Sequence, residues 1–243
     1  MNSSSPPIQI LVISLERSLD RRKQVEQEMK KISLPWSFLD AVDGSRLNEP
    51  PVEYKPKKVK RLQGYELTPN EIGCYLSHKK AWQRCVEGNV PTLVLEDDFV
   101  LSPDFQNILM TMLNQMPQYG FIRLQGLYEV PCQEILSISG VSLVKNRGDA
   151  VGATAYLLQP DIAKELIKHS ANIYEPVDHF LEHYQKHGLE FLATRPYPVD
   201  ITRAKSTIAD RSERAPVKGL RKRFRSVART VDRIFSKEHW FPK

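Results

Sequence analysis

The stretch "TLVLEDDFVLSPDF", residues 92–105, places three consecutive carboxylates, Glu96, Asp97 and Asp98, directly after an apolar run. A continuous apolar run is typical of a strand that is buried on both faces of a sheet. In α/β proteins, ligands bind beyond the carboxyl ends of such strands. Because side chains alternate along an extended segment, Glu96 and Asp98 are predicted to point one way and Asp97 the other.

Two carboxylates on one side form part of a site for a hard cation. Proteins hold Mg²⁺ or Mn²⁺ with one or two carboxylates and the oxygens of a substrate phosphate. The stretch therefore predicts Glu96 and Asp98 as ligands of Mn²⁺ or Mg²⁺ that bridges a nucleotide diphosphate to the protein. The alternative is a solvated acidic loop, or carboxylates that precede the helix start at Ser102 and Pro103.

Strand and helix patterns alternate around this stretch for most of the chain. Strands are predicted at 8–15, 36–44, 92–95, 121–126, 134–144, 151–158 and 189–194. Helices are predicted at 18–32, 68–88, after Ser102 and Pro103, at 159–169 and at 175–188. The helix at 68–88 has the clearest limits, with Thr68 as N-cap, Pro69 in its first turn and Gly88 as terminator. The alternation predicts an α/β fold with a mainly parallel central sheet flanked by helices.

Length and composition fit one domain with an appendage. The chain has 243 residues, of which 41% are hydrophobic and 26% charged, as in ordinary globular proteins. The beginning lacks the pattern of a signal peptide, and no run of 18 uncharged apolar residues occurs. The three cysteines show no metal-type spacing and fit a reducing compartment. A cytoplasmic protein is expected.

The positive charge of the chain is concentrated in its last part. Residues 214–243 contain ten Lys and Arg against two acids, whereas residues 1–213 are nearly neutral. Apolar residues recur there at helical spacing, with basic residues on the other arc. The apolar positions are Leu220, Phe224, Val227, Val231 and Ile234. We predict a domain at 1–213 and a tail at 214–243 that binds an anionic membrane surface. A solvated or core-docked helix and a nucleic-acid-binding tail are the alternatives, although no nucleic-acid motif accompanies the charge.

The helix predicted at 68–88 carries two polar residues within its apolar arc. Thr68 and Glu71 have the spacing of a capping box, which accounts for Glu71. His78 is either a buried histidine with a satisfied hydrogen bond or a contact to a bound ligand, with Gly73 permitting close approach of the backbone.

Six segments in order resemble glycosyltransferase family 25, which includes bacterial lipooligosaccharide galactosyltransferases. They are "VISLERSLDR", "AVDG", "LTPNEIGCYLSHKKAW", "LVLEDD", "GATAYLLQPDIAKEL" and "PVDHF". Ser14 departs from the family pattern, which usually has Asn there. The resemblance implies a GT-A fold and inverting transfer of a hexose, galactose from UDP-galactose, to a sugar hydroxyl.

The resemblance also implies roles for individual residues. The family's metal and diphosphate motif maps to Glu96, Asp97 and Asp98, with Asp98 as the direct ligand. The other donor-binding residues implied are Leu15, Arg17, Arg21, Asp43, Gly44, Gly73, Ser77, His78 and Gln125. Arg21 has the alternative of an ordinary charge on a helix surface.

Asp178 is the expected catalytic base, because the family's proline-then-aspartate motif falls on it. The alternative is an acid favoured at the start of a helix by the macrodipole. The nearby His179, His183 and His187 recur at helical spacing, and we interpret them as a solvated face and not as metal ligands.

The resemblance, together with the basic tail, thus implies a metal-dependent galactosyltransferase that acts on a lipooligosaccharide or lipopolysaccharide acceptor at the inner face of the bacterial inner membrane. Two other classes are open. A phosphohydrolase or nucleotidyltransferase would use the same acids, and a non-catalytic membrane adaptor would depend on residues 214–243 alone.

Overall fold

The computed structural model describes residues 7–183 and 187–202. Eight strands form the central sheet: β1 (Gln9–Ser14), β2 (Ser37–Asp40), β3 (Thr92–Glu96), β5 (Phe121–Arg123), β6 (Cys132–Ile138), β7 (Val141–Asn146), β8 (Ala155–Leu158) and β9 (Leu192–Arg195). Their order across the sheet is β2-β1-β3-β8-β5-β9-β7-β6. A separate antiparallel pair consists of β4 (Phe99–Leu101) and β10 (Val199–Ile201).

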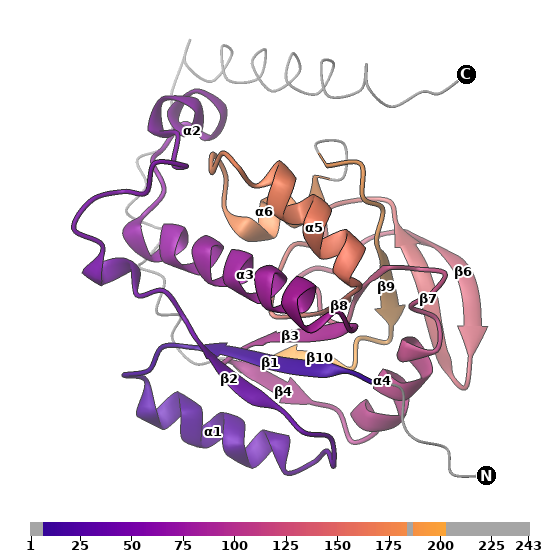
Figure 1. Ribbon diagram of the computed structural model, residues 1–243. Coiled ribbons are helices and arrows are strands. Elements are labelled where there is room, and N and C mark those ends of the chain that lie inside the picture. Colours follow the sequence, from indigo (N-terminus) through magenta and orange to yellow (C-terminus); the bar gives the residue numbers. More distant parts are fainter. Residues whose placement is uncertain (1–6, 184–186, 203–243) are drawn as a thin grey trace, which may run out of the picture.

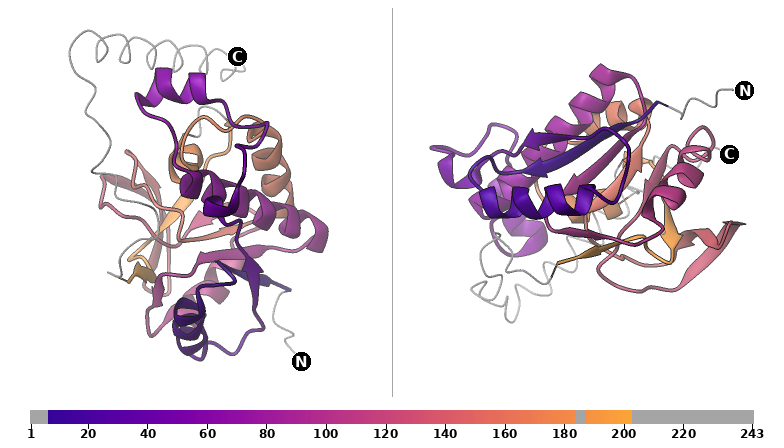
Figure 2. Two further views of the ribbon diagram at one scale, coloured as in Figure 1. Left: turned by 90° about the vertical axis from the view of Figure 1, so that its left-hand side faces the viewer. Right: turned by 90° about the horizontal axis from the view of Figure 1, so that it is seen from below.

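Helices cover both faces of the sheet. They are α1 (Leu19–Met29), α2 (Pro56–Gln63), α3 (Pro69–Gly88), α4 (Phe105–Leu113), α5 (Pro160–His169) and α6 (Val177–Glu182), with a short 3₁₀ helix, η1 (Gly44–Arg46). Figure 1 shows α3, α5 and α6 above the sheet and α1 below it, and the side view in Figure 2 shows the same layers. The predicted α/β fold with flanking helices is confirmed.

Alternate residues of the central strands supply two hydrophobic cores. Ile10 and Val12 of β1 pack on the side of α1 and α4, whereas Leu11 and Ile13 pack on the side of α3, α5 and α6. The apolar run of β3 behaves as predicted, because Leu93, Val94 and Leu95 are each 0% exposed. Removing such side chains from water is the main source of stability for this layered arrangement.

The sheet is mixed, whereas the alternation of elements predicted a mainly parallel one. Parallel pairs join β1 to β2, β1 to β3 and β5 to β9. The other neighbours are antiparallel. Residues 134–144 lie in a hairpin whose turn residues Ser139 and Gly140 have φ of 51° and 79°, and such a two-residue turn joins antiparallel strands. β8 also runs antiparallel, between β3 and β5.

Local signals at the start of α3 are confirmed. Thr68 Oγ1 accepts from Glu71 N at 3.2 Å, and Thr68 N donates to Glu71 Oε2 at 2.9 Å, which completes a capping box. Pro69 occupies the first turn, and the helix ends at Gly88, where Asn89 takes a left-handed φ of 49°. The box explains why Glu71 is buried within an apolar face.

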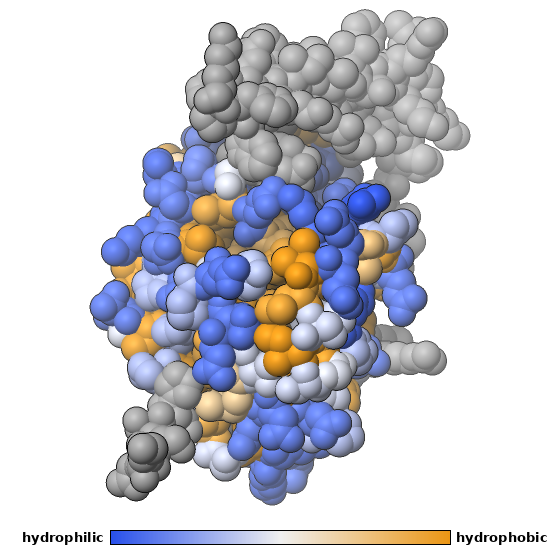
Figure 3. All heavy atoms as spheres, turned by 90° about the vertical axis from the view of Figure 1, so that its right-hand side faces the viewer, coloured by the Kyte–Doolittle hydropathy of each residue, from blue (hydrophilic) through white to orange (hydrophobic). Residues whose placement is uncertain are grey.

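The far edge of the sheet exposes apolar surface. Figure 3 views the molecule from the side of β6 and β7, and hydrophobic residues reach the surface there between polar ones. Leu127, Tyr128 and Ile135 are among the exposed large side chains. Within the described residues, no helix combines the length and the hydropathy needed to span a bilayer. The predicted tail at 214–243, and with it the domain boundary at 213, lies outside the described residues.

The helix predicted at 175–188 is interrupted at His183 in the structure, and the solvated face assigned to its histidines is wrong for His187. α6 ends at Glu182, and His187 is only 4% exposed. Its Nε2 lies 3.2 Å from Phe180 O, and its Nδ1 accepts from Leu189 N at 3.1 Å. Only the neutral ring with hydrogen on Nε2 can make both bonds. His183 pairs with the buried Glu175 at 2.7 Å.

We expect His187 to make the protein acid-sensitive. Burial is the main cause that lowers the pKa of His187 from 6.5 to about 4. The unfolded chain takes up a proton below pH 6.5 and the folded chain only below pH 4, so stability is full above 6.5 and is lost as pH falls through this window. The loss is about 3 kcal/mol. Urea unfolding between pH 7.5 and 4.5 should show this slope, and His187→Gln should flatten it.

The matched control for His187 is His169→Gln, which changes a histidine that is 34% exposed. Its unfolding free energy should keep the wild-type slope with pH. An unchanged slope in His187→Gln would contradict the assignment.

Candidate active site

A cavity of about 160 Å³ opens at the carboxyl ends of β1 and β3. The connection from β1 to β2 runs through α1 on one face of the sheet, and the connection from β2 to β3 runs through α3 on the other. The two strands therefore flank a topological switch point, where α/β sheets bind ligands. The cavity walls come from the segment after β1, the turn after β2, the first half of α3 and the acids after β3.

Most of the predicted site residues meet at this cavity. Those that line it are Leu15, Arg17, Arg21, Gly44, Ser77, Glu96, Asp97 and Asp98. The others, Asp43, Gly73, His78, Gln125 and Asp178, lie outside its lining. Asp43 and Gly73 adjoin the lining in the chain, and His78 contacts it through Glu96.

Asp97 forms hydrogen bonds to the cavity wall that β1 and α1 provide. It accepts from Ser14 Oγ at 2.7 Å through Oδ2 and from Arg21 Nη1 at 2.7 Å through Oδ1. Ser14 therefore makes a hydrogen bond although it replaces the usual Asn. Arg21 ties the start of α1 to the end of β3 and is more than a surface charge. Because Arg21 balances the charge of Asp97, the other two acids are left for a cation.

Asp98 has the properties expected of a metal ligand. Its Oδ1 is buried and has no hydrogen-bond partner. Burial, followed by the negative charges of Glu96 and Asp97, raises the pKa of Asp98 to about 7. A divalent cation at this point would satisfy the unpartnered oxygen and offset the repulsion between the acids. The residues thus fit Mn²⁺ or Mg²⁺, both of which prefer carboxylate oxygens.

Glu96 extends in the other direction, toward α3. Its Oε1 lies 3.0 Å from His78 Nε2 and 3.6 Å from Cys74 Sγ, and its Oε2 accepts from Thr154 Oγ1 at 3.3 Å. Burial opposes ionisation of Glu96, but these hydrogen bonds outweigh it, so the pKa lies below its ordinary value. Cys74, His78 and Glu96 offer ligand atoms within 4.8 Å of one another, so this group could also hold a metal.

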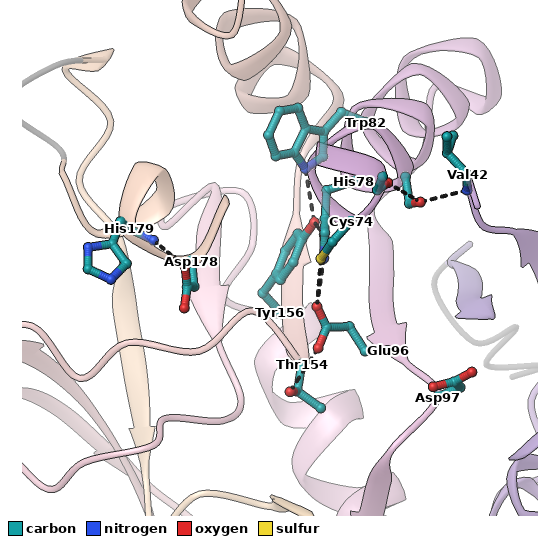
Figure 4. A network of polar contacts seen from close by, with 12 residues as sticks. Val42, Cys74, His78, Trp82, Glu96, Asp97, Thr154, Tyr156, Asp178 and His179 are labelled. Atoms are coloured by element: carbon teal, nitrogen blue, oxygen red, sulfur yellow. Dashed lines mark hydrogen bonds and ion pairs between the residues drawn. The ribbon is translucent and has the colours of Figure 1, made fainter. Parts of the chain in front are cut away.

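Behind Glu96 lies a chain of buried hydrogen bonds. His78 Nδ1 lies 2.7 Å from Tyr156 Oη, which accepts from Trp82 Nε1 at 2.9 Å. Figure 4 shows this chain running from Trp82 on α3 to Glu96 at the end of β3, with Asp97 on the far side. The side chain of His78 is 0% exposed and meets the cavity through Glu96. The surroundings of His78 therefore agree with its interpretation as a buried histidine with a satisfied hydrogen bond.

Arg17 and Asp43 form the outer lip of the cavity. Arg17 Nε donates to Asp43 Oδ2 at 2.6 Å. The bonds from Arg17 and then from Ser45 hold the pKa of Asp43 well below its usual range. Asp43 also caps η1, so its carboxylate fixes the turn after β2. Arg17 remains half exposed, with 51% of its side chain accessible, and can turn toward an anion.

Two glycines let α3 pack against that turn. A Cβ on Gly44 would lie 2.0 Å from Pro69 O, and one on Gly73 would lie 2.6 Å from Val42 O. Ser77 reinforces the contact, because its Oγ accepts from Val42 N at 2.8 Å and donates to Gly73 O at 2.7 Å. The close approach that Gly73 permits is thus to the turn after β2.

We expect Gly73→Ala to destabilise the protein by about 1–3 kcal/mol, because the methyl group meets rigid backbone. It should also change the shape of the cavity by displacing the turn that carries Gly44. Gly88→Ala is the matched control on the same helix, since its Cβ would meet only the end of Gln9 at 3.5 Å. That variant should be neutral or more stable by up to about 1 kcal/mol. Urea unfolding of both variants decides this, and equal stability would contradict the packing argument.

Asp178 lies in the first turn of α6 and is 9% exposed. Its Oδ1 accepts from His179 N at 2.9 Å. Burial, and then Glu96, Asp178 and Asp98, raise the pKa of Cys74, so these three carboxylates all act on the same thiol. Figure 4 places Asp178 on the other side of Tyr156 from Asp97. Asp178 thus acts on Cys74 from α6, on the other side of Tyr156.

Gln125 lies beyond β5, away from the cavity lining. It is 2% exposed, and its Oε1 has no partner. Close by, Arg123 and Glu182 form a buried ion pair, and Glu182 Oε1 also accepts from Val151 N at 2.7 Å. Val151 has φ of 52°, an unusual value for a β-branched residue. The ion pair therefore holds a strained loop before β8.

Sequence reasoning missed several residues of the site. Cys74 and Asn70 line the cavity, and Thr154, Tyr156 and Trp82 support Glu96. One signal was available, because Cys74, His78 and Trp82 recur at i, i+4 and i+8 on one face of α3. The contribution of β8 had no comparable signal, because it depends on the antiparallel placement of that strand beside β3.

The comparisons with known proteins point to one family. The model of "Glycosyltransferase family 25 (LPS biosynthesis protein)" matches residues 7–181. Procollagen galactosyltransferase 2 of Homo sapiens is 31% identical over 118 residues, which are 45% of this chain and 18% of that protein. Lipooligosaccharide biosynthesis protein lic2B of Haemophilus influenzae is 25% identical over 171 residues, 67% of this chain and 63% of that protein.

A probable inactive family 25 member 3 of Bos taurus is 27% identical over 205 residues, 79% of this chain and 34% of that protein. The chain thus spans between 18% and 34% of the first animal relatives. Among solved structures, a glycosyltransferase involved in the glycosylation of the major capsid of PBCV-1 is 12% identical, with a TM-score of 0.32, and the match covers 68% of this chain and 67% of that one. The family match extends over most of the described residues and confirms the resemblance seen in the sequence: this chain belongs to glycosyltransferase family 25.

Proposed function

We propose that the protein is a metal-assisted hexosyltransferase with a GT-A-type fold. It transfers galactose from UDP-galactose, with inversion, to a sugar hydroxyl of a lipooligosaccharide or lipopolysaccharide acceptor. The donor and acceptor follow the names of the relatives, galactosyltransferases in animals and a lipooligosaccharide biosynthesis protein in a bacterium. Because some relatives are named inactive, the activity itself requires a test.

One observation supports the proposal most strongly. The unpartnered Oδ1 of Asp98 lies beside Glu96 at the end of a buried strand and next to a cavity with arginines on its other wall. Asp98 and Glu96 would hold Mn²⁺ or Mg²⁺, which when bound stabilises the negative charge of a departing diphosphate. Arg17 lies where it can pair with a phosphate, and Leu15 and Gly44 offer close-packed walls to the nucleoside.

The chemistry also requires a base. In a single inverting displacement, the acceptor oxygen forms a bond to the anomeric carbon while the bond from that carbon to the diphosphate breaks. The acceptor hydroxyl loses its proton, and we assign that proton to the carboxylate of Asp178. The positive charge that develops on the sugar carbon resembles that in glycoside hydrolysis.

The proposal is tested by a donor screen with the full chain. Thermal stabilisation would be measured with UDP, UDP-galactose, UDP-glucose and UDP-N-acetylglucosamine, each with and without Mn²⁺ or Mg²⁺. We expect stabilisation by UDP only with metal, and the largest shift with UDP-galactose. Equal stabilisation without metal would refute the role of the acids. Release of inorganic phosphate without sugar transfer would instead identify a phosphohydrolase.

We further propose that residues 214–243 hold the enzyme on the anionic inner face of the membrane where its acceptor lies. Support comes from the ten basic residues and the apolar period of this segment. The full chain should float with vesicles that contain anionic phospholipid and stay behind with neutral vesicles. Replacing Arg221, Lys222 and Arg225 by Gln should reduce the bound fraction. An equal bound fraction with anionic and with neutral vesicles would contradict the assignment.

A further inference from the structure

Two side chains of α3 stand behind the cavity with their polar atoms aimed at one tyrosine. His78 and Trp82 are separated by one helical turn and share a face of α3, and Tyr156 comes from β8. The pairing of Val94 with Tyr156 puts this strand directly beside β3, which ends at Glu96. These elements, distant in sequence, build one continuous line of hydrogen bonds that ends at the cavity.

The direction of every hydrogen in this line follows from the chemistry of its members. The indole of Trp82 can only donate, so Tyr156 Oη accepts from it. The hydroxyl has one hydrogen, and His78 Nδ1 at 2.7 Å is its other partner among the described residues. Nδ1 must then accept, which leaves the ring hydrogen on Nε2, facing Glu96 Oε1 at 3.0 Å. The opposite tautomer would leave the tyrosine hydrogen without an acceptor.

Burial makes this arrangement strict. Trp82 and His78 are 0% exposed and Tyr156 is 1% exposed, so water cannot replace a missing partner. A buried polar atom that loses its hydrogen bond costs about 1–3 kcal/mol. The line therefore has one low-energy pattern of donors and acceptors, and that pattern ends with a donor to Glu96.

The same pattern determines which part of Glu96 is available. A carboxylate has about four acceptor positions. Oε1 receives His78 Nε2–H and the Cys74 thiol, and Oε2 receives Thr154. One position on Oε2 remains, and Glu96 is among the residues that line the cavity. Both positions on Oε1 are already used.

We infer that Trp82, Tyr156 and His78 form a positioning relay that fixes the orientation of Glu96 and leaves only Oε2 for the cation or the donor. His78 is then a positioning residue that acts through Glu96. The inference rests on the proposed function, in which Glu96 binds the metal and donor complex. It also assigns Cys74 and His78 as hydrogen-bond donors to Glu96, in place of a second set of metal ligands.

The direct test is the tautomer of His78 in the metal-free full chain. Long-range nitrogen–proton NMR of ¹⁵N-histidine protein reports which ring nitrogen carries hydrogen, and the signal that disappears in His78→Gln identifies His78. We expect hydrogen on Nε2 and none on Nδ1. Hydrogen on Nδ1 would overturn the relay. This measurement needs no activity, so it stands even if the wild-type chain binds no UDP, a result that would contradict the proposed function alone.

The functional test removes one hydroxyl from the relay. Tyr156→Phe should raise the Mn²⁺ dissociation constant by about 10-fold, the low end of the range for loss of a direct partner of a metal ligand, because Tyr156 acts on Glu96 through His78. His78→Gln, which keeps an N–H donor, should lose less affinity than His78→Leu. Tyr75→Phe is the matched control, because Tyr75 is also 1% exposed on α3 and is not part of the relay. Its Mn²⁺ affinity should equal that of the wild type.

Two results would overturn the inference. One is equal Mn²⁺ affinity in Tyr156→Phe and Tyr75→Phe. The other is stoichiometric binding of Zn²⁺ alone to the wild-type chain with protection of the Cys74 thiol from alkylation, which would make Cys74, His78 and Glu96 a metal site.

Discussion

Asp98→Asn should abolish metal-dependent binding of UDP and lower the transfer rate by about 10²–10³-fold. A metal ion contributes several kcal/mol to the stabilisation of charge in the transition state, and each 1.36 kcal/mol is a factor of ten in rate. Asn preserves the size of the side chain but supplies no negative charge. Isothermal titration with UDP and Mn²⁺, followed by a transfer assay with UDP-galactose, measures both effects.

The control for Asp98 is Asp104→Asn. Asp104 lies a few residues further along the chain, directly before α4, but it is exposed and forms no side-chain cap on that helix. Its variant should bind UDP and transfer sugar at the wild-type rate. If Asp98→Asn retained metal-dependent UDP binding, the cation would have to be held elsewhere, and the group formed by Cys74, His78 and Glu96 would become the first candidate.

Asp98→Asn should also make the metal-free protein more stable at pH 8. The pKa of Asp98 in the folded chain is about 7 against an ordinary 3.8, so the folded state binds the proton more tightly. The stability that this proton supplies is complete below pH 3.8 and is lost as the pH rises through 7, at about 1.36 kcal/mol per pKa unit. Asn removes that loss. A gain in stability together with a loss of binding is the pattern expected of a functional residue.

The parts of the fold that were predictable depend on neighbours in sequence. The apolar run before Glu96 is a buried strand, and Thr68 and Glu71 form the expected capping box. These features arise from residues within one helical turn or one strand, where the pattern of residue types determines the backbone conformation. The meeting of Arg17, Arg21 and Asp98 at one cavity could also be predicted, because the carboxyl ends of parallel strands lie at the same edge of a sheet.

The parts that were not predictable depend on which strands lie side by side. Tyr156 meets His78 across 78 positions of sequence, because β8 enters the sheet antiparallel to β3. Alternation of helices and strands indicates layers but does not specify strand order or direction. His187 is buried for a similar reason, since α6 ends at Glu182 and the ring of His187 packs against Phe180. The hairpin at Ser139 and Gly140 could have been recognised from its turn residues.

Asp178→Asn should lower the transfer rate by about 10²–10⁴-fold, the usual contribution of a general base, and leave the affinity for UDP and Mn²⁺ unchanged. Asn retains the volume of the side chain and can still accept from His179 N, so the first turn of α6 should be preserved. Asp178 lies outside the cavity lining, so its loss should not affect the proposed diphosphate site. Separate measurement of UDP affinity and of transfer distinguishes a base from a donor-binding residue.

Asp161→Asn is the matched control for the alternative that Asp178 only stabilises its helix. Asp161 is also the second residue of a helix, α5, and is exposed. If the acids serve only the helix macrodipole, both variants should lose a similar 0.3–1 kcal/mol or so of stability and neither should lose activity. If Asp178 takes the acceptor proton, only its variant loses transfer. Normal transfer by Asp178→Asn would mean that another carboxylate is the base. Glu96 and Asp98 would then be the candidates, and experiments would have to distinguish a role as base from a role as metal ligand.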